Sequence, residues 1–345
     1  MKIKIDRNKF IGDNQPCFII AEIGSNHNQD INLAYKLIDA AYKAGADAVK
    51  FQTFRASSHF SKYSPGFDFL NNKPMYDLIK SLELNRSWQK KLKKFSENRG
   101  LVFFSSPCDD DAIESLSKLK VQLYKVASFD ISDLNLIYSI AKQKKPVIIS
   151  TGMANNQDIE NAISSCKKAQ NKKIILLQCT SLYPTPSKLS NLNAIVALRK
   201  KYGYLTGFSD HTLGDHMPVS AVALGACVIE KHFTINKNLK GPDHKFAMEP
   251  LEFKTMVNKI REVESGLGDG KKIGPLKEEN EMAKKGRRSL HAAKTILAGE
   301  KIKKEMLTAK RPGLGILPSK IKKVVGKRAK KKILEDKWIT WKMIK

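Results

Sequence analysis

The sequence predicts an α/β fold, a TIM (β/α)8 barrel, followed by a small β-rich domain. Up to about residue 265, short β-rich runs alternate with amphipathic helical stretches, which is the pattern of parallel α/β folds. Eight such units fall within roughly 250 residues, the usual size of a TIM barrel. Almost every β-rich run ends in polar side chains, whereas a doubly wound sheet needs them only near its switch point. A closed barrel with a site at its C-terminal mouth is therefore favoured.

Short runs rich in β-branched and aromatic residues are the strand candidates. They are Cys17–Ile23, Ala48–Thr53, Leu101–Ser106, Leu123–Ser128, Pro146–Thr151, Ile174–Thr180, Tyr204–Ser209 and Cys227–Phe233. Stretches with helical spacing of apolar residues are the helix candidates. They are Asn32–Ala44, Ser87–Arg99, Asp110–Leu119, Leu134–Lys142, Gln157–Ala169, Asn191–Lys201, Pro218–Leu224 and Pro250–Glu264. Between the second and third strands, Ala56 to Leu84 contains the turn signals Pro65-Gly66 and Asn71-Asn72-Lys73-Pro74, and we expect an insertion over the mouth.

A domain boundary is expected near Gly266–Gly274, where glycine recurs. A charged, helix-like stretch follows at Lys277–Lys285, and after Arg287 the pattern changes to short strands and turns. We therefore predict a barrel domain over residues 1–275, a linker over 276–286 and a small domain over 287–345. About 60 residues form only a small core, so we expect this domain to pack against the barrel or another subunit.

The chain of 345 residues carries 62 Lys and Arg against 34 Asp and Glu, a formal net charge of +28. Such a charge invites a nucleic-acid interpretation. Most lysines, however, are scattered through amphipathic stretches, and no tract interleaves aromatic and basic side chains as single-strand binding surfaces do. The one dense basic stretch is the tail, with Lys320, Lys322, Lys323, Lys327, Arg328, Lys330, Lys331 and Lys332. We expect a solvated lysine-rich surface that binds no nucleic acid and helps attract small anionic substrates.

The sequence also predicts the compartment. No apolar run approaches the roughly 20 residues of a membrane-spanning helix, and Met1–Asp6 lacks the apolar core of a signal peptide. The five cysteines are an odd number without Cys-x-x-Cys spacing, which argues against a disulfide framework or a zinc cluster. We therefore expect a cytoplasmic protein with reduced thiols and no membrane partner.

Two short apolar runs end in a histidine beside polar residues, at Gly207–Thr212 and Val228–Thr234. Neighbouring parallel strands would place His211 and His232 at one mouth, where they could hold a divalent metal over a substrate. Imidazole suits manganese, zinc, iron or cobalt, whereas magnesium prefers oxygen. Water and substrate would fill the remaining positions, as a catalytic metal requires. A lone histidine after an apolar run is usually structural, so the metal-site interpretation depends on finding two such histidines at consecutive strand ends.

Motifs with chemical character follow the strand ends in a fixed order: Ala21–His27, Val49–Gln52, Tyr124–Ser128, Ile149–Met153, Cys179–Pro184, Ser209–Thr212, Glu230–Phe233 and Gly241–His244. Together they resemble the sialic acid synthase family, which makes nonulosonic acids by joining phosphoenolpyruvate to an N-acylated hexosamine. Arg288–Leu290 and Lys310–Gly313 extend the resemblance into that family's antifreeze-like C-terminal domain, the SAF domain. The resemblance covers nearly the whole chain, and the ordered set is far more specific than any one motif.

Phosphoenolpyruvate carries a carboxylate and a phosphate, so its site needs several cations and hydroxyl donors. The resemblance implies that Lys50 and Lys125 hold the two anionic groups. It also implies that serines donate to the phosphate, namely Ser106, Ser128, Ser150, Ser181 and Ser209. Each lysine could instead be a rim residue whose stem lies on apolar surface. Lys50, however, lies inside the apolar strand Ala48–Thr53, which favours function.

The implied reaction forms a carbon–carbon bond. The methylene carbon of phosphoenolpyruvate attacks the open-chain sugar aldehyde, water adds at C2, and phosphate leaves by C–O cleavage. We expect Glu22 to transfer a proton or bind a sugar hydroxyl. The resemblance implies a divalent metal on His211 and His232, with Mn²⁺ preferred and Mg²⁺ or Co²⁺ as alternatives.

The expected sugar contacts are Gln52, Asp130, Tyr183, Asp243 and, from the C-terminal domain, Arg311. Asp130 could instead cap a helix that begins at Leu134. In the family, an arginine of the C-terminal domain reaches into the partner subunit's site and contacts the N-acyl group. If Arg311 does so, the protein is at least a domain-swapped homodimer; otherwise it is a basic residue beside a turn.

The sugar itself stays open between two branches. Gly241–Lys245 resembles N-acetylneuraminate synthases, which use N-acetylmannosamine, and this is the main expectation. Phe104–Pro107 and Tyr124–Ile131 resemble pseudaminate synthases more, so the alternative is a pseudaminate or legionaminate synthase that uses a 6-deoxy-diacetamido hexose. Two more distant alternatives are a Schiff-base aldolase with Lys125 or Lys231 as nucleophile and a basic nucleic-acid-binding protein.

Overall fold

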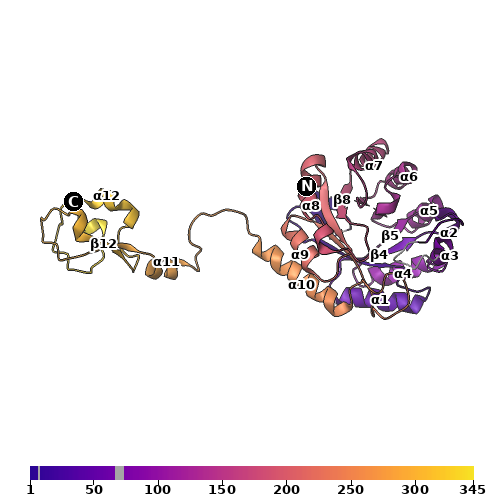
Figure 1. Ribbon diagram of the computed structural model, residues 1–345, viewed down its shortest axis with the longest axis horizontal. Coiled ribbons are helices and arrows are strands. Elements are labelled where there is room, and N and C mark those ends of the chain that lie inside the picture. Colours follow the sequence, from indigo (N-terminus) through magenta and orange to yellow (C-terminus); the bar gives the residue numbers. More distant parts are fainter. Residues whose placement is uncertain (7, 67–73) are drawn as a thin grey trace. The chain divides into compact units, whose positions relative to one another are not determined.

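The computed structural model describes residues 1–6, 8–66 and 74–345 and divides into two compact units, Met1–Gly268 and Asp269–Lys345. In the first unit, parallel strands form a closed barrel in the order β10-β3-β4-β5-β6-β7-β8-β9, and helices surround it (Figure 1). The predicted TIM barrel is therefore confirmed. The limits drawn from the sequence for the two domains and the linker stay predictions.

The barrel strands lie close to the predicted runs. They are β3 (Phe18–Gly24), β4 (Ala48–Thr53), β5 (Val102–Pro107), β6 (Tyr124–Val126), β7 (Val147–Ser150), β8 (Ile174–Cys179), β9 (Leu205–Asp210) and β10 (Val228–His232). The main helices around them are α1 (Ile31–Lys43), α4 (Gln89–Glu97), α5 (Asp110–Lys118), α6 (Leu134–Lys142), α7 (Asn156–Lys168), α8 (Asn193–Tyr202), α9 (His216–Ala223) and α10 (Pro250–Gly266). Each strand-to-helix connection therefore opens at the carboxyl end of a strand, as a barrel active site needs.

Short acidic or amide side chains fix where several helices begin. The carboxylate of Asp30 accepts a hydrogen bond from the backbone of Asn32 at the start of α1. Asp109 caps α5 in the same way, and Asn155 forms a capping box at the start of α7. Each such cap stabilises its helix by about 0.5–2 kcal/mol. The caps also set the length of each loop at the barrel mouth.

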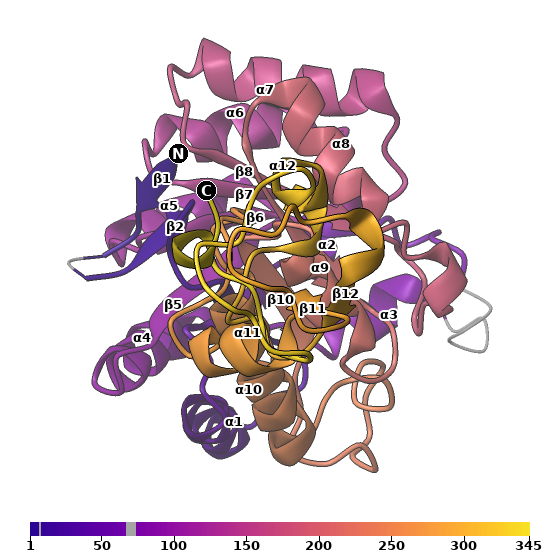
Figure 2. The ribbon, with the colours of Figure 1, turned by 90° about the vertical axis from the view of Figure 1, so that its left-hand side faces the viewer.

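Alternation along the strands divides the core into two layers. On β3, Phe18 and Ile20 belong to one apolar cluster, while Ile19, Ala21 and Ile23 belong to another that includes the helices. Because strand side chains alternate, the first cluster fills the barrel interior and the second lies between strands and helices. An N-terminal hairpin, β1 (Lys2–Lys4) with β2 (Phe10–Gly12), was not predicted (Figure 2). It adds Ile3, Ile5 and Ile11 to the interior cluster.

The predicted insertion is described in part. It forms two short helices, α2 (Ala56–His59) and α3 (Met75–Lys80). Residues 67–73, which include the predicted turn signal Asn71-Asn72-Lys73, lie outside the described residues. The described part contributes one wall of the pocket considered below.

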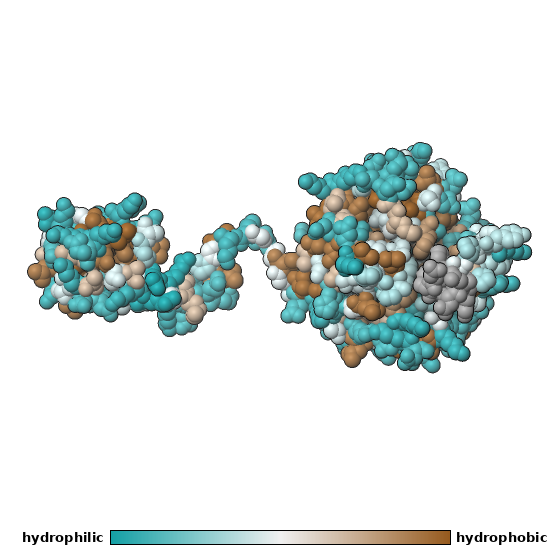
Figure 3. All heavy atoms as spheres, viewed as in Figure 1, coloured by the Kyte–Doolittle hydropathy of each residue, from teal (hydrophilic) through white to brown (hydrophobic). Residues whose placement is uncertain are grey.

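The second unit has a core of its own. It contains α11 (Asn280–Gly286), the antiparallel pair β11 (Ser289–Ala292) and β12 (Leu307–Lys310), and α12 (Ile321–Val324). The core joins Leu290, Ala292, Ile296, Ile302, Met306, Ile316, Val324, Ala329, Ile333, Ile339 and Ile344. On the face seen in Figure 3, both units are largely hydrophilic with scattered apolar groups. Within the described ranges, no helix has the length and apolar character needed to cross a membrane.

Candidate active site

A pocket of about 550 Å³ lies where the barrel strands end. Alternation explains its lining, because residues two apart on a strand face the same side. On β10, Val228 belongs to the apolar cluster that fills the barrel interior, so Glu230 and His232 also point inward, above that cluster. The same alternation on the other strands brings in these predicted residues: Glu22, Lys50, Gln52, Ser106, Lys125, Ser150 and Ser209, together with His232 on β10. The segments that follow the strands add the predicted residues Ser128, Asp130, Tyr183, His211 and Asp243.

Two lysines and two glutamates form a buried charged network on the pocket floor. The Lys50 ammonium lies 2.9 Å from Glu22 Oε1 and 3.7 Å from Glu230 Oε2. The Lys125 ammonium donates to Ser150 Oγ at 2.7 Å and lies 3.9 Å from Glu230 Oε1. Ser209 donates to the same Glu230 oxygen at 3.0 Å. Cations and hydroxyls therefore converge at one place, as an anionic substrate needs.

The surroundings of Glu22 and Glu230 shift the pKa values of these two carboxyl groups in opposite directions. Burial raises the pKa of Glu22 to about 7, although Lys50 opposes this shift. Burial also acts to raise the pKa of Glu230, but the attraction of Lys125 and Lys50 outweighs it and leaves that pKa below its ordinary value. A carboxyl group that exchanges its proton near neutrality is suited to acid–base work, whereas Glu230 remains a fixed negative charge.

Several buried polar atoms of the pocket have no hydrogen-bond partner among the described residues. They are Glu22 Oε2, Glu230 Oε2, His232 Nδ1 and, beside the pocket, Ser181 Oγ. Leaving a buried polar group unpaired costs about 1–3 kcal/mol, so such atoms are uncommon in folded proteins. At the barrel mouth, a substrate or a metal would supply the missing partners of these four atoms.

The two predicted metal ligands fit a divalent cation. Their ring centroids are 5.4 Å apart. The Nδ1–H of His211 donates to the Thr180 carbonyl at 2.8 Å, so Nε2 is the nitrogen that would bind a metal when the ring is neutral, as is typical of ligating histidines. Burial, and then the nearby His211, hold the pKa of His232 well below its ordinary value, so this ring is neutral and its buried Nδ1 is unpartnered. Asp243 Oδ2 lies 3.6 Å from that nitrogen and could join the set.

The predicted sugar contacts lie above this floor. Gln52 donates to Glu22 Oε1 at 2.8 Å, and the Tyr183 ring lies 4.3 Å from that of His211, measured between centroids. Asp130 ends a short 3-10 turn, and its carboxylate faces the pocket. The alternative that Asp130 caps the helix at Leu134 is wrong, because Asp133 is the cap of α6.

Two predicted residues are not part of the pocket lining. Ser181 lies beside it: a Cβ placed on Gly152 would lie 2.5 Å from Ser181 Oγ and 2.9 Å from Ser128 Oγ. Arg311 belongs to the second unit, where it is exposed and its Nε donates to the Gly286 carbonyl at 2.6 Å. Its role at a partner's site stays a prediction.

Lys231, one of the two lysines considered as a Schiff-base nucleophile, does not line the pocket. Lys231 lies between Glu230 and His232 on β10, so it points to the other side of the barrel wall. There it is buried and paired with the Asp210 carboxylate and the Thr212 carbonyl. A lysine so placed cannot reach a substrate in the pocket.

Sequence reasoning missed several pocket residues. Glu230 could have been found, because it is two residues before His232 and therefore on the same face. Cys108 and Cys179 also line the pocket, and neither was among the predicted site residues. The apolar wall was also missed; it consists of Phe60, Met75, Leu78, Ile79 and Leu82, which come from the insertion.

Comparison with known proteins identifies the family of the chain. The NeuB family model matches residues 37–272, and the SAF domain model matches residues 287–345. The chain is 40% identical over 328 residues to N,N'-diacetyllegionaminic acid synthase of Campylobacter jejuni, which covers 93% of this chain and 98% of that protein. It is 40% identical over 325 residues to a pseudaminic acid synthase of Campylobacter jejuni, with 92% and 93% covered.

A solved structure shows the same architecture. The N-acetylneuraminic acid (sialic acid) synthetase of Leptospira borgpetersenii superposes with a TM-score of 0.75 at 37% identity, covering 81% of this chain and 94% of that one. These matches confirm the resemblance seen in the motifs and the predicted enzyme class, a phosphoenolpyruvate-dependent transferase that forms a carbon–carbon bond. The chain therefore belongs to the NeuB family of nonulosonic acid synthases and carries a C-terminal SAF domain.

Proposed function

We propose that this protein condenses phosphoenolpyruvate with a 6-deoxy-diacetamido hexose to give a diacetamido nonulosonic acid of the legionaminate or pseudaminate type, with release of phosphate. Two of the relatives named above favour this branch over the main sequence expectation, N-acetylmannosamine, because they are synthases of legionaminic and pseudaminic acids and are each 40% identical to the chain. The observation that carries the proposal is the apolar wall of the pocket.

That wall faces the polar floor. Phe60 follows α2, and Met75, Leu78 and Ile79 lie on α3, with Leu82 just beyond it. A 6-deoxy sugar presents a C6 methyl group and two acetamido methyl groups, which gain free energy when they leave water against such side chains. A C6 hydroxyl against the same surface would lose its hydrogen bonds to water, at a cost of about 1–3 kcal/mol. The wall therefore suits the deoxy sugar.

The floor suits phosphoenolpyruvate. Lys50 and Lys125 provide two buried cations, and Ser106, Ser150 and Ser209 place hydroxyls beside them. The hydroxyls of Ser128 and Ser181 lie close to Gly152, where a side chain would collide with both of them, and they would donate to the phosphate. The floor would thus anchor both anionic groups and leave the methylene carbon of the substrate turned toward the sugar.

A divalent metal bound by His211 and His232 would act as a Lewis acid toward the sugar aldehyde. Glu22, whose pKa is raised to about 7, gives a proton to the aldehyde oxygen as the new carbon–carbon bond forms. It recovers a proton from the water that adds at C2. Glu230, held ionised by the two lysines, stabilises positive charge as it develops at C2. Loss of phosphate by C–O cleavage then completes the reaction.

Isotope tracing tests this reaction class. With phosphoenolpyruvate labelled with ¹⁸O at the bridging position, Mn²⁺ and a 6-deoxy-diacetamido hexose, the label is expected in the released phosphate, because the C–O bond breaks. His211→Ala is expected to abolish phosphate release while leaving the circular dichroism spectrum unchanged. Label retained in the sugar product, or full activity of His211→Ala, would contradict the proposal.

A further inference from the structure

A second group of metal-binding side chains lies at the rim of the same pocket. His59 ends α2, Cys108 follows β5, and Asp130 ends the turn after β6. One ligand atom from each lies within 4.8 Å of the other two. The three residues follow the neighbouring strands β4, β5 and β6, so the parallel sheet brings their loops together at one end. None of them belongs to the His211–His232 pair.

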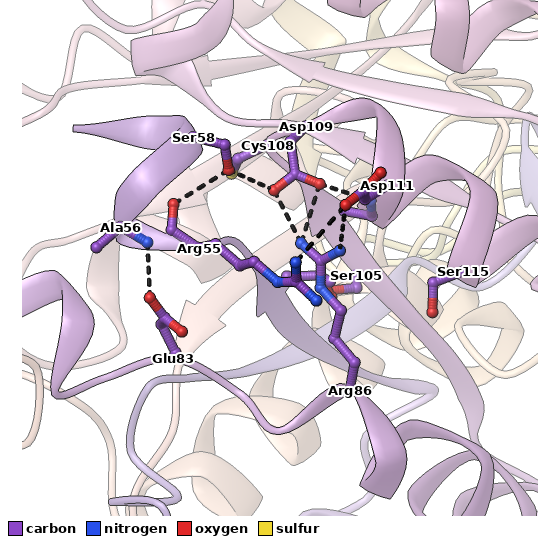
Figure 4. A network of polar contacts seen from close by, with 12 residues as sticks. Arg55, Ala56, Ser58, Glu83, Arg86, Ser105, Cys108, Asp109, Asp111 and Ser115 are labelled. Atoms are coloured by element: carbon purple, nitrogen blue, oxygen red, sulfur yellow. Dashed lines mark hydrogen bonds and ion pairs between the residues drawn. The ribbon is translucent and has the colours of Figure 1, made fainter. Parts of the chain in front are cut away.

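The surrounding contacts hold His59 beside Cys108. The backbone N–H of Ala56, at the start of α2, donates to Glu83 Oε1 at 2.7 Å, and the Ser58 hydroxyl donates to Asp109 Oδ2 at 2.8 Å (Figure 4). Arg86 binds both oxygens of Asp109, at 2.8 and 2.9 Å. Because Asp109 is the residue after Cys108, this network ties the short helix directly to the thiol-bearing segment.

Aromatic contacts fix the imidazole itself. The His59 ring stacks on Phe54, with centroids 6.1 Å apart and planes 20° apart. It also meets Phe60 edge-on, with centroids 4.9 Å apart. On the other side, Cys108 Sγ lies 3.9 Å from Asp130 Oδ2. Two of the three ligands are therefore already adjacent, and the third has a defined orientation.

The donor set is specific for a borderline-soft metal. A thiolate, an imidazole and a carboxylate are the ligands of zinc, whereas Mg²⁺ favours oxygen ligands. Ligand atoms about 2.0–2.3 Å from a tetrahedral zinc stand roughly 3.3–3.8 Å apart, so small side-chain rotations would close the site. Three protein ligands leave the fourth position for water, on the side that faces the pocket.

We propose that His59, Cys108 and Asp130 form a Zn²⁺ site at the rim of the pocket. Binding converts the Cys108 thiol to a thiolate and releases its proton to solvent. The bound zinc engages the Asp130 carboxylate and thereby competes with the sugar. The metal site stands on its own geometry; only the competition with sugar rests on the proposed function.

Cobalt substitution tests the site without any activity measurement. Titration of the full chain with Co²⁺ is expected to produce the near-ultraviolet charge-transfer band of a cobalt–thiolate bond. Cys108→Ser is expected to remove this band. His59→Gln or His59→Ala is expected to weaken Co²⁺ and Zn²⁺ binding by more than about 100-fold, since loss of even a residue that only supports a metal ligand lowers metal affinity about 10–100-fold.

Cys179→Ser is the matched control, because Cys179 Sγ lies 3.9 Å from His211 Nδ1 in the other candidate site. The band is expected to survive in this variant. Its absence in the wild type, or its loss in Cys179→Ser but not in Cys108→Ser, would overturn the zinc site.

Inhibition kinetics separate the two proposals. With Mn²⁺ saturating, Zn²⁺ is expected to raise the KM for sugar and leave the KM for phosphoenolpyruvate unchanged, and His59→Gln is expected to relieve this effect. A cobalt–thiolate band that depends on Cys108 would support the metal site even if the inhibition by Zn²⁺ did not depend on the sugar concentration. That combination of results would refute the placement of sugar at Asp130.

Discussion

Replacing Lys125 by methionine removes one buried cation from the pocket floor with little change in shape. The ammonium has three N–H donors, and two of them bond Ser150 Oγ at 2.7 Å and the Val126 carbonyl at 2.8 Å. At least one donor is therefore available to phosphoenolpyruvate. A hydrogen bond to a charged group contributes about 1.5–3 kcal/mol. Since 1.36 kcal/mol is a factor of ten, kcat/KM for phosphoenolpyruvate is expected to fall about 10- to 150-fold.

The fold itself is expected to tolerate this change. Burial already lowers the pKa of Lys125, so methionine escapes a desolvation cost that lysine carries. Glu230 keeps the Ser209 hydroxyl at 3.0 Å and the Lys50 ammonium at 3.7 Å, so it is not left unpaired. The melting temperature should therefore stay close to that of the wild type.

Steady-state phosphate release at varied phosphoenolpyruvate provides the assay, with thermal melting on the same samples. The matched control is Lys118→Met on the outer helix α5, where the lysine side chain is 73% exposed and pairs with Glu114. Such an exposed pair contributes only a few tenths of a kcal/mol, so both readouts should be unchanged. A loss of less than about threefold in Lys125→Met would refute the role of the lysine as an anion anchor.

Four further outcomes are expected. Lys231→Met leaves the buried Asp210 carboxylate without its cation and should lower the free energy of unfolding, measured by urea denaturation, by about 3–5 kcal/mol. The double variant Lys231→Met/Asp210→Asn should recover most of this loss. Equal stability of the single and the double variant would contradict the pairing. Gly152→Ala places a methyl group between two serine hydroxyls and should raise the KM for phosphoenolpyruvate more than about tenfold, with the KM for sugar unchanged. Removal of divalent metal with a chelator should abolish turnover, and Mn²⁺ should restore it without any change in circular dichroism. Arg311→Ala should mainly raise the KM for sugar. If subunits exchange C-terminal domains, mixing the Arg311→Ala protein with the inactive His211→Ala protein should restore activity at low sugar concentration. No restoration would argue against the swapped dimer.

Much of the barrel could be predicted because its strands are short buried runs with clear ends. The predicted run Ala48–Thr53 coincides with β4, and the others differ from the observed strands by a residue or so at either end. Polar residues at the strand ends indicated the mouth, since barrel sites lie there. The hairpin of β1 and β2 was missed because three-residue strands show no usable periodicity.

The pocket could be predicted only where strands supply it. Lys50 was predicted because it is a lysine within an apolar strand, and Glu22 because it is a carboxylate at a strand end. The apolar wall comes from the six-residue helix α3 and from residues just after α2 and α3, where no helical pattern is long enough to identify a face. The group of His59, Cys108 and Asp130 depends on how the segments after β4, β5 and β6 fold, which a single sequence does not reveal. Asp130 was weighed as a cap because the true cap, Asp133, lies in the same polar stretch.

Direct competition between sugars tests the central claim, that an apolar wall opposite an anion-binding floor selects a 6-deoxy-diacetamido hexose. Equal concentrations of such a hexose and of N-acetylmannosamine are incubated with phosphoenolpyruvate and Mn²⁺, and the two products are quantified by mass spectrometry. The product ratio gives the ratio of kcat/KM values. Burial of a methyl group, together with the cost of an unpaired hydroxyl, predicts a preference of more than about tenfold for the diacetamido sugar. Equal use of the two sugars, or a preference for N-acetylmannosamine, would contradict the claim.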